Sequence, residues 1–190
     1  HNPRYRGSGL DALRKSHRPF KNRISWDVLQ ARLNSLGNRK KWSFVRASLL
    51  YQEALRCRKC NPSVSMLVLC SCAESMKVAG GKAGCRKNFK EFFLRYCPQG
   101  LRNPPIEYYP LASPPPVAAP FDKALDFIYK KFRCLYIHEG IGHLRPLPRG
   151  TTWIYAPLLD KYGKEIYVVD TLKILDWFLA VTFECLSTIL

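Results

Sequence analysis

The chain has 190 residues, of which 47% are hydrophobic and 24% charged, and its formal net charge at pH 7 is +17. This length is enough for one domain with a full hydrophobic core, and the composition is that of a globular protein. We expect no membrane span, because Lys173, Asp176 and Glu184 interrupt the most apolar segment before it reaches about 18 residues.

The N-terminal part of the chain holds most of the positive charge. Residues 1–60 carry 15 Lys and Arg against three acidic residues, whereas residues 104–190 carry nine against nine. A basic excess on one part of a folded protein is typical of a surface that binds a polyanion. We therefore expect a nucleic acid as a partner, with a solubilising tail or an anionic membrane surface as the alternatives. The candidate nucleic-acid contacts are Arg39, Lys40, Lys41, Arg46, Arg56, Arg58 and Lys59.

The first helices are marked by their end signals. Residues 1–23 contain few apolar side chains, which predicts a basic arm, either flexible or ordered on contact, ahead of a single helical domain over residues 24–190. Ser25 is a suitable N-cap for a first helix that ends at Gly37. A second helix is expected over about residues 41–59.

A third helix opens at Asn61, with Pro62 at its first position. Its residues are apolar nearly all round, except for Glu74 at the end, so it should be the central helix of the fold.

The chain has eight cysteines and no apolar secretory signal at its start, which indicates reduced thiols and a cytoplasmic location. Cys57 and Cys60 have the spacing of half a zinc site, but Cys70 and Cys72 are a poor second half because they fall in the apolar third helix. We expect no metal and no cofactor, with zinc at Cys57 and Cys60 as the alternative.

The middle of the chain changes from helix to a proline-rich connection. Residues 87–96 have the apolar spacing of a short amphipathic helix. Residues 98–120 hold eight prolines, which predicts an irregular, polyproline-like connection across the surface.

The last part of the chain completes an all-α bundle. Apolar residues on one face predict a helix over about residues 121–139. Two β-rich runs, 151–155 and 165–169, flank a polar turn and predict a hairpin over 151–169. A final helix follows from Asp170 or Thr171. The expected fold is a helical bundle of five or six helices with a small β-hairpin insertion before the last helix.

Two segments resemble a known family. Residues 128–140 place Arg133 and His138 late in a helix and ahead of Gly140, and residues 67–75 form an apolar helix that ends in Ala-Glu-Ser. A short helix of the type Phe-x-x-Phe-Phe-Leu follows the second segment. In these features the sequence resembles the HEPN superfamily, particularly its ApeA-like branch, whose signature is Arg-x(4–6)-His.

The resemblance implies metal-independent RNA cleavage at the cleft of a homodimer. In that reading Arg133 binds the phosphate and His138 transfers a proton, with Glu74, Cys134, Glu139 and His143 in supporting positions. The chemistry is reasonable, because RNA supplies its own 2′-hydroxyl nucleophile, an imidazole titrates near neutral pH, and a guanidinium stabilises the developing phosphorane charge.

Three functions stay open at this point. The first is an endoribonuclease of toxin or defence type. The second is a non-catalytic module that binds RNA or a nucleotide, which Cys134 favours because the family has a polar residue there. The third is an assembly protein that binds an acidic partner such as an antitoxin. Arg133 has its own alternative, an ion pair with Glu74, and His138 has another, a partner of a helix C-terminus.

Overall fold

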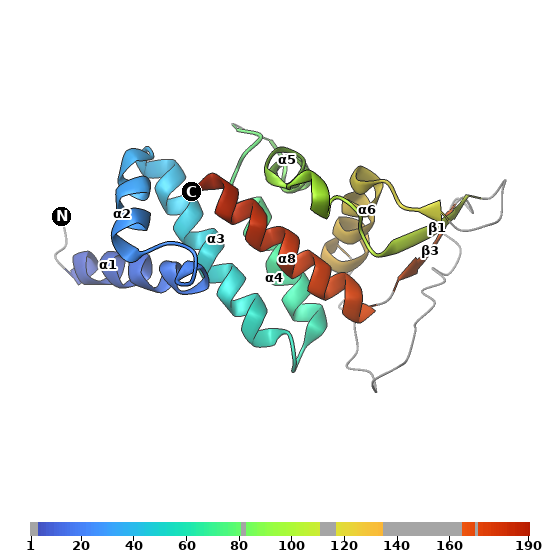
Figure 1. Ribbon diagram of the computed structural model, residues 1–190, viewed down its shortest axis with the longest axis horizontal. Coiled ribbons are helices and arrows are strands. Elements are labelled where there is room, and N and C mark those ends of the chain that lie inside the picture. Colours follow the sequence, from blue (N-terminus) through green and yellow to red (C-terminus); the bar gives the residue numbers. More distant parts are fainter. Residues whose placement is uncertain (1–3, 81–82, 111–116, 135–164, 170) are drawn as a thin grey trace.

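The computed structural model describes residues 4–80, 83–110, 117–134, 165–169 and 171–190, and these form a helical bundle with a small β-sheet at one end (Figure 1). The helices are α1 (Arg4–His17), α2 (Trp26–Ser35), α3 (Asn38–Cys57), α4 (Pro62–Ser75), α5 (Cys85–Tyr96), α6 (Phe121–Ile128) and α8 (Thr171–Ile189). The strands are β1 (Ile106–Pro110), β2 (Val117–Ala118) and β3 (Glu165–Val169). The expected all-α fold with a small β element is confirmed.

Helix α4 is the centre of the bundle, as its composition predicts. It packs against α3, α5 and α8, and Met66, Leu69 and Ala73 are fully buried there. The Asn61 side chain caps its first turn by accepting a hydrogen bond from the Val64 amide at 3.1 Å. The cap and the apolar surface therefore act together to fix this helix.

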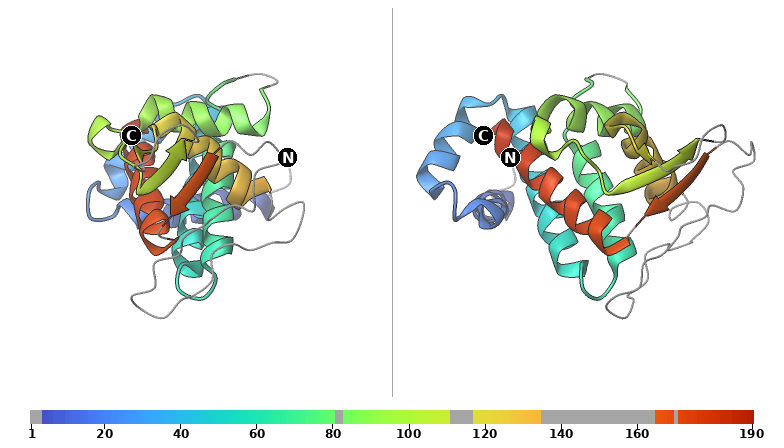
Figure 2. Two further views of the ribbon diagram at one scale, coloured as in Figure 1. Left: turned by 90° about the vertical axis from the view of Figure 1, so that its right-hand side faces the viewer. Right: turned by 45° about the vertical axis from the view of Figure 1, so that its right-hand side comes forward.

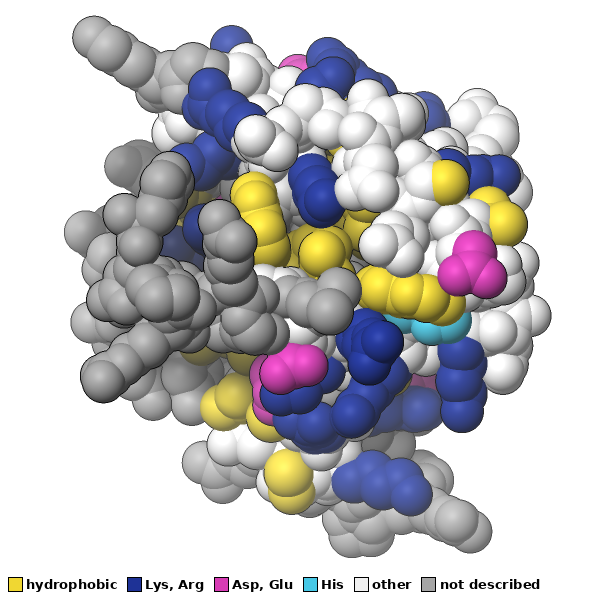
Figure 3. All heavy atoms as spheres, turned by 90° about the vertical axis from the view of Figure 1, so that its left-hand side faces the viewer, with side chains coloured by type: hydrophobic (Ala, Val, Ile, Leu, Met, Phe, Trp, Pro, Cys, Tyr) yellow, Lys and Arg dark blue, Asp and Glu magenta, His cyan; other side chains and the backbone are white. Residues whose placement is uncertain are grey.

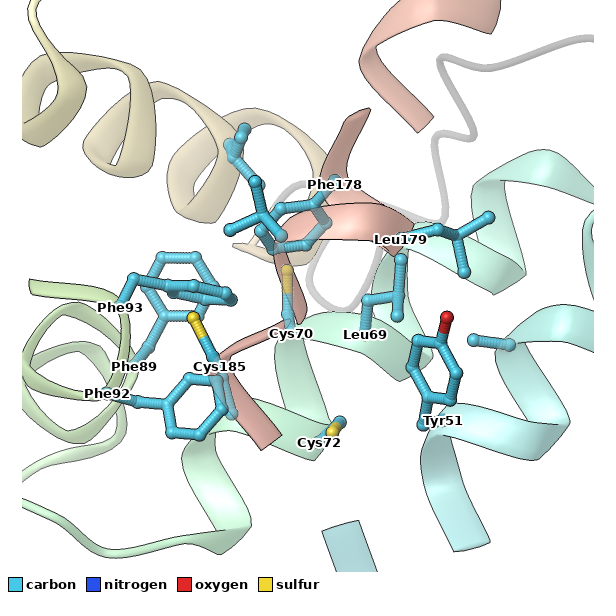
Figure 4. Packing of buried hydrophobic residues seen from close by; sticks show 14 of the residues in the cluster. Tyr51, Leu69, Cys70, Cys72, Phe89, Phe92, Phe93, Phe178, Leu179 and Cys185 are labelled. Carbon is cyan, nitrogen blue, oxygen red and sulfur yellow. The ribbon is translucent and has the colours of Figure 1, made fainter. Parts of the chain in front are cut away.

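Aromatic rings from α5 and α8 fill the core beside α4 (Figure 4). The centroid of Phe93 lies 5.0 Å from that of Phe92, 5.1 Å from that of Phe89 and 5.1 Å from that of Phe178. All four rings are fully buried, and Cys185 of α8 lies among the α5 rings. This contact joins the two helices that flank α4.

The expectation of a flexible arm over residues 1–23 is wrong for the described residues 4–23. They form α1 and a 3-10 helix, Arg18–Phe20. Phe20 is only 1% exposed, and its ring stacks on that of Phe183 with centroids 5.3 Å apart. One large aromatic side chain buries enough apolar surface to hold a polar segment on the bundle. An average over the composition of the segment does not reveal such an anchor.

The expectation of an irregular connection over residues 98–120 is also wrong for part of that range. It contains a 3-10 helix, Gln99–Leu101, and the strands β1 and β2. Strand β1 is the middle of an antiparallel sheet of order β2-β1-β3. Pro104 and Pro105 precede β1 and so lie outside its ladder, where a missing amide is tolerated.

The sheet also changes the partner expected for the strand at 165–169. Strand β3 pairs with β1, so that Tyr167 lies opposite Tyr108. The other half of the expected hairpin, residues 151–155, lies outside the described residues. The residues of β3 have a high β-propensity that the sequence shows directly. The pairing of β3 with a strand almost 60 residues earlier depends on the tertiary fold.

The helix expected over residues 121–139 is found as two segments within the described part of the chain. Helix α6 runs into a π-helical segment, Tyr129–Cys134. The expected apolar face is confirmed, since Leu125, Ile128 and Phe132 are buried.

The two ends of the molecule differ in character. The sheet lies at the opposite end of the bundle from α1 and α2 (Figure 2). Among the described residues, no helix has the length and apolar character needed to cross a membrane.

Candidate functional site

Arg133 lies on the π-helical segment and is held by Glu74 at the end of α4. Its Nε donates to Oε1 of Glu74 at 2.9 Å, and its Nη2 donates to Oε2 at 3.4 Å. The Arg133 side chain is 20% exposed and that of Glu74 is 13% exposed. The ion pair raised as an alternative role for Arg133 is therefore formed.

The surroundings of Arg133 favour the charged state of its guanidinium. The hydrogen bond that Arg133 donates to Glu74 is the main cause that raises the pKa of its guanidinium. The guanidinium also lies 5.7 Å from the centroid of the Tyr129 ring. Burial, and then the negative charge of Glu74, raise the pKa of the Tyr129 hydroxyl, so that it stays protonated at neutral pH. Glu74 thus neutralises Arg133 and fixes its orientation.

The two cysteines beside the pair have a packing role. Cys70 is fully buried on α4, and this burial, followed by the charge of Glu74, raises the pKa of its thiol. Cys134 is half-buried against the hydrophobic core. A protonated, enclosed thiol is a poor nucleophile, so the Cys70 thiol is not a catalytic candidate.

The other expected site residues divide into two groups. His138, Glu139 and His143 lie outside the described residues, so their placement relative to Arg133 stays a prediction. Cys60 is exposed at the end of α3, and its thiol lies 3.6 Å from the carbonyl oxygen of Cys57. Within the described part of the chain, no cluster of three or more His, Cys, Asp or Glu could hold a metal ion.

The expected RNA contacts separate to the two ends of α3. At its C-terminal end Arg56 forms an ion pair with Glu53, and Arg58 pairs with Asp176 of α8 at 2.6 Å. These two guanidinium groups are therefore already neutralised by the protein. Lys59 is exposed beside them.

At the N-terminal end of α3, basic residues line a cavity of about 490 Å³. Its cations come from three parts of the fold: Arg39 and Lys40 from α3, Lys77 from the turn after α4, and Arg95 from the end of α5. Its described lining residues are Leu36, Arg39, Lys40, Ser43, Met76, Lys77, Val78, Gly80, Arg95, Tyr96, Thr188 and Ile189.

A second cavity of about 270 Å³ continues the first along α3. It is lined by Asn38, Arg39, Trp42, Ser43, Arg46 and Lys77, so the two cavities share three residues. We call the two together the basic groove. Lys41, expected as a contact, instead donates to Oδ1 of Asn34 at 2.7 Å.

Backbone geometry explains how Lys77 reaches the basic groove. Its φ of 50° is in the left-handed region, and its amide donates to the Glu74 carbonyl at 3.3 Å. Helix α4 therefore ends in a left-handed turn that redirects the chain. Gly80, with a φ of 72°, makes a second left-handed position that favours glycine.

The basic groove lacks counter-charges among the residues that the structure describes. None of its described lining residues is Asp or Glu, and none of its five cations forms an ion pair with another described residue. Elsewhere, acidic residues form ion pairs with basic residues, for example Glu184 with Arg23 and Asp126 with Arg86. Figure 3 shows the α1 and α2 end, where Lys and Arg side chains are spread over the surface with few Asp and Glu.

Sequence reasoning identified only part of this groove. It identified Arg39, Lys40 and Arg46, but missed Trp42, Lys77 and Arg95. The last two lie outside α3 in the sequence, and the packing of α4 on α3 and of α5 on α4 brings them there.

Comparisons of the chain with protein-family models, with curated proteins and with solved structures give no match. The likeness to the HEPN superfamily therefore stays a prediction from two short sequence segments, and function has to be argued from the geometry of this chain.

Proposed function

We propose that this chain binds RNA through the basic groove. The observation that carries the proposal is the convergence of five cations from α3, the turn after α4 and α5 on one concave surface, without a described acidic residue to neutralise them. A guanidinium or ammonium group left without a counter-charge in a cavity is well placed for a phosphate oxygen.

The charge of the whole chain supports a polyanion as the ligand. At +17, the protein attracts any nucleic acid at long range and releases counterions when phosphates replace them. The volume of the larger cavity, about 490 Å³, falls in the range of ligand sites and suits a nucleotide-sized group.

The test compares a groove variant with a control of equal charge. The groove variant is R39Q/K77Q/R95Q. The control, K15Q/K21Q/K87Q, removes three exposed Lys that neither line the groove nor are among the contacts expected from the sequence. Fluorescence anisotropy with a labelled single-stranded RNA should show about 50-fold weaker binding at 0.15 M salt for the groove variant, and much less loss for the control. Equal loss in both variants would refute a groove-specific site.

RNA cleavage is a second candidate, supported by one specific observation. Arg133 lies on a π-helical segment, a local structure that is frequent at functional sites, and Glu74 fixes its guanidinium. In this reaction His138 accepts the proton of the 2′-hydroxyl and the 2′-oxygen attacks phosphorus. The 5′-oxygen then leaves with a proton, and a 2′,3′-cyclic phosphate forms. Arg133 contacts the phosphate in the transition state, across the cleft of a homodimer.

Cleavage is tested with EDTA present, so that metal-dependent contaminants are silent. Wild-type protein should give products that end in 2′,3′-cyclic phosphate, and His138→Ala and Arg133→Ala should both lose them. If wild-type protein binds RNA but leaves it intact, the chain is a non-catalytic RNA-binding module.

An acidic protein partner, such as an antitoxin, would compete with RNA for the same groove. Adding such a protein to the anisotropy assay detects this competition.

A further inference from the structure

An exposed tryptophan stands inside the basic groove. Trp42 of α3 is 43% exposed and lines the smaller cavity together with Arg39 and Arg46. An indole is a large apolar group, so its exposure between two cations needs an explanation other than core packing.

Helix α1 supports the indole from one side. A Cβ at Gly9 would lie 3.4 Å from Cη2 of Trp42, so one edge of the indole lies close to the backbone of α1. Trp42 also lines the smaller cavity. Helix α1 therefore limits the positions open to the indole on that side, which reduces the entropy that a ligand must overcome.

Cations lie on both sides of this ring along the helix. Arg39, Trp42 and Arg46 have the i, i+3, i+7 spacing of one helical face, so each arginine lies about one turn from the indole. Ser43 adds a hydroxyl at the junction of the two cavities, and Tyr96 adds a second aromatic ring in the larger one. Aromatic rings between cations are the combination that single-stranded nucleic-acid sites use.

We propose that the basic groove selects single-stranded over double-stranded nucleic acid, and that one unpaired base stacks on Trp42. This inference rests on the proposed RNA-binding function and names its substrate class. In a duplex the bases are paired and stacked on one another, so none can reach an indole inside a cavity of about 270 Å³. Double-stranded RNA is instead recognised by its shape over a surface of about 16 base pairs.

The main part of the experiment measures three ligands with three proteins, and one further variant and two further ligands follow as additional tests. The ligands are a labelled 12-nucleotide single-stranded RNA, the same strand in a blunt duplex, and polyphosphate, which has the charge but no bases. The proteins are wild type, Trp42→Ala, and Leu55→Ala, which truncates a side chain of similar exposure (41%) toward the other end of the same helix. Circular dichroism and the unfolding midpoint verify that each variant is folded.

Trp42→Ala should weaken single-strand binding by about 5- to 150-fold, the loss expected for one stacked base. Its affinity for the duplex and for polyphosphate should stay unchanged, and Leu55→Ala should bind all three ligands as wild type does. Trp42→Phe should restore most of the single-strand affinity, because a smaller ring still stacks.

The results separate the two proposals. If wild type binds RNA but does not distinguish single strand from duplex, and Trp42→Ala changes neither, the stacking inference is overturned while RNA binding stands. If wild type binds no RNA, or binds anionic phosphatidylserine vesicles more tightly than RNA, both proposals fail. A matching loss for single-stranded DNA would support the inference and widen its ligand to either sugar.

Discussion

The salt dependence of RNA binding measures how many cations of the basic groove contact phosphates. For a single strand, the logarithm of the binding constant falls by about 0.7 per phosphate contact for each tenfold rise in salt. Five groove cations therefore give a slope of about −3.5, and the two that remain in R39Q/K77Q/R95Q give about −1.4.

These slopes translate into affinities that are easily separated. Between 50 and 200 mM salt, wild-type affinity should fall about 130-fold, and that of the groove variant only about sevenfold. At 0.15 M the same relation makes the groove variant about 50-fold weaker than wild type. Fluorescence anisotropy titrations at four salt concentrations give both slopes.

The control variant decides whether the groove or the net charge is responsible. K15Q/K21Q/K87Q has lost as much charge but keeps all five groove cations, so its slope should stay near that of wild type. If its slope flattens as much as that of R39Q/K77Q/R95Q, binding follows diffuse charge, and the reasoning from the groove is refuted.

Three further predictions concern stability, measured by urea unfolding. Glu74→Gln removes the counter-charge of the partly buried Arg133 and should lower the free energy of unfolding by about 2 kcal/mol. Glu53→Gln, at the exposed pair with Arg56, should change it by almost nothing. Similar losses in the two variants would contradict a special role for the Glu74–Arg133 pair. Phe20→Ala should cost about 3–5 kcal/mol, because this ring docks the N-terminal segment, and a loss below about 1 kcal/mol would mean that the segment is not packed. Burial opposes ionisation of Asp126, but hydrogen bonds from Lys90 and Arg86 outweigh it and lower its pKa below 3.8. The ionised carboxylate therefore stabilises the folded state above pH 3.8, and this stabilisation is lost as the pH falls through the lowered pKa. Asp126→Asn should accordingly lower the free energy of unfolding at pH 7 and lower it much less at pH 2. An equal loss at the two pH values would contradict the lowered pKa.

Local signals in the sequence predicted the helices well. Ser25 caps α2 by accepting a hydrogen bond from the Val28 amide, and Asn61 caps α4 in the same way. Such end signals act within four residues, as does the spacing that marks the buried face of α6. These features need no tertiary information, which is why the expected bundle was confirmed.

The errors arose where distant segments decide the structure. The N-terminal segment looked like an arm because its composition is polar, yet Phe20 packs against Phe183 of the last helix. The proline-rich range looked irregular, yet β1 is stabilised by strand β3 from the far end of the chain. Composition averages out a single anchor, and strand propensity does not name a partner.

The candidate site had the same limitation, and α4 shows why. Glu74 and Lys77 are three residues apart, but the left-handed conformation at Lys77 separates their roles. Glu74 points to Arg133 and neutralises it, whereas Lys77 lines the basic groove beside Arg39. The net charge predicted a polyanion as partner but did not indicate where on the fold it would bind. The location of the proposed site follows from which basic residues have no acidic partner in the described part of the chain. Those residues come together because the start of α3, the end of α4 and the end of α5 line one cavity.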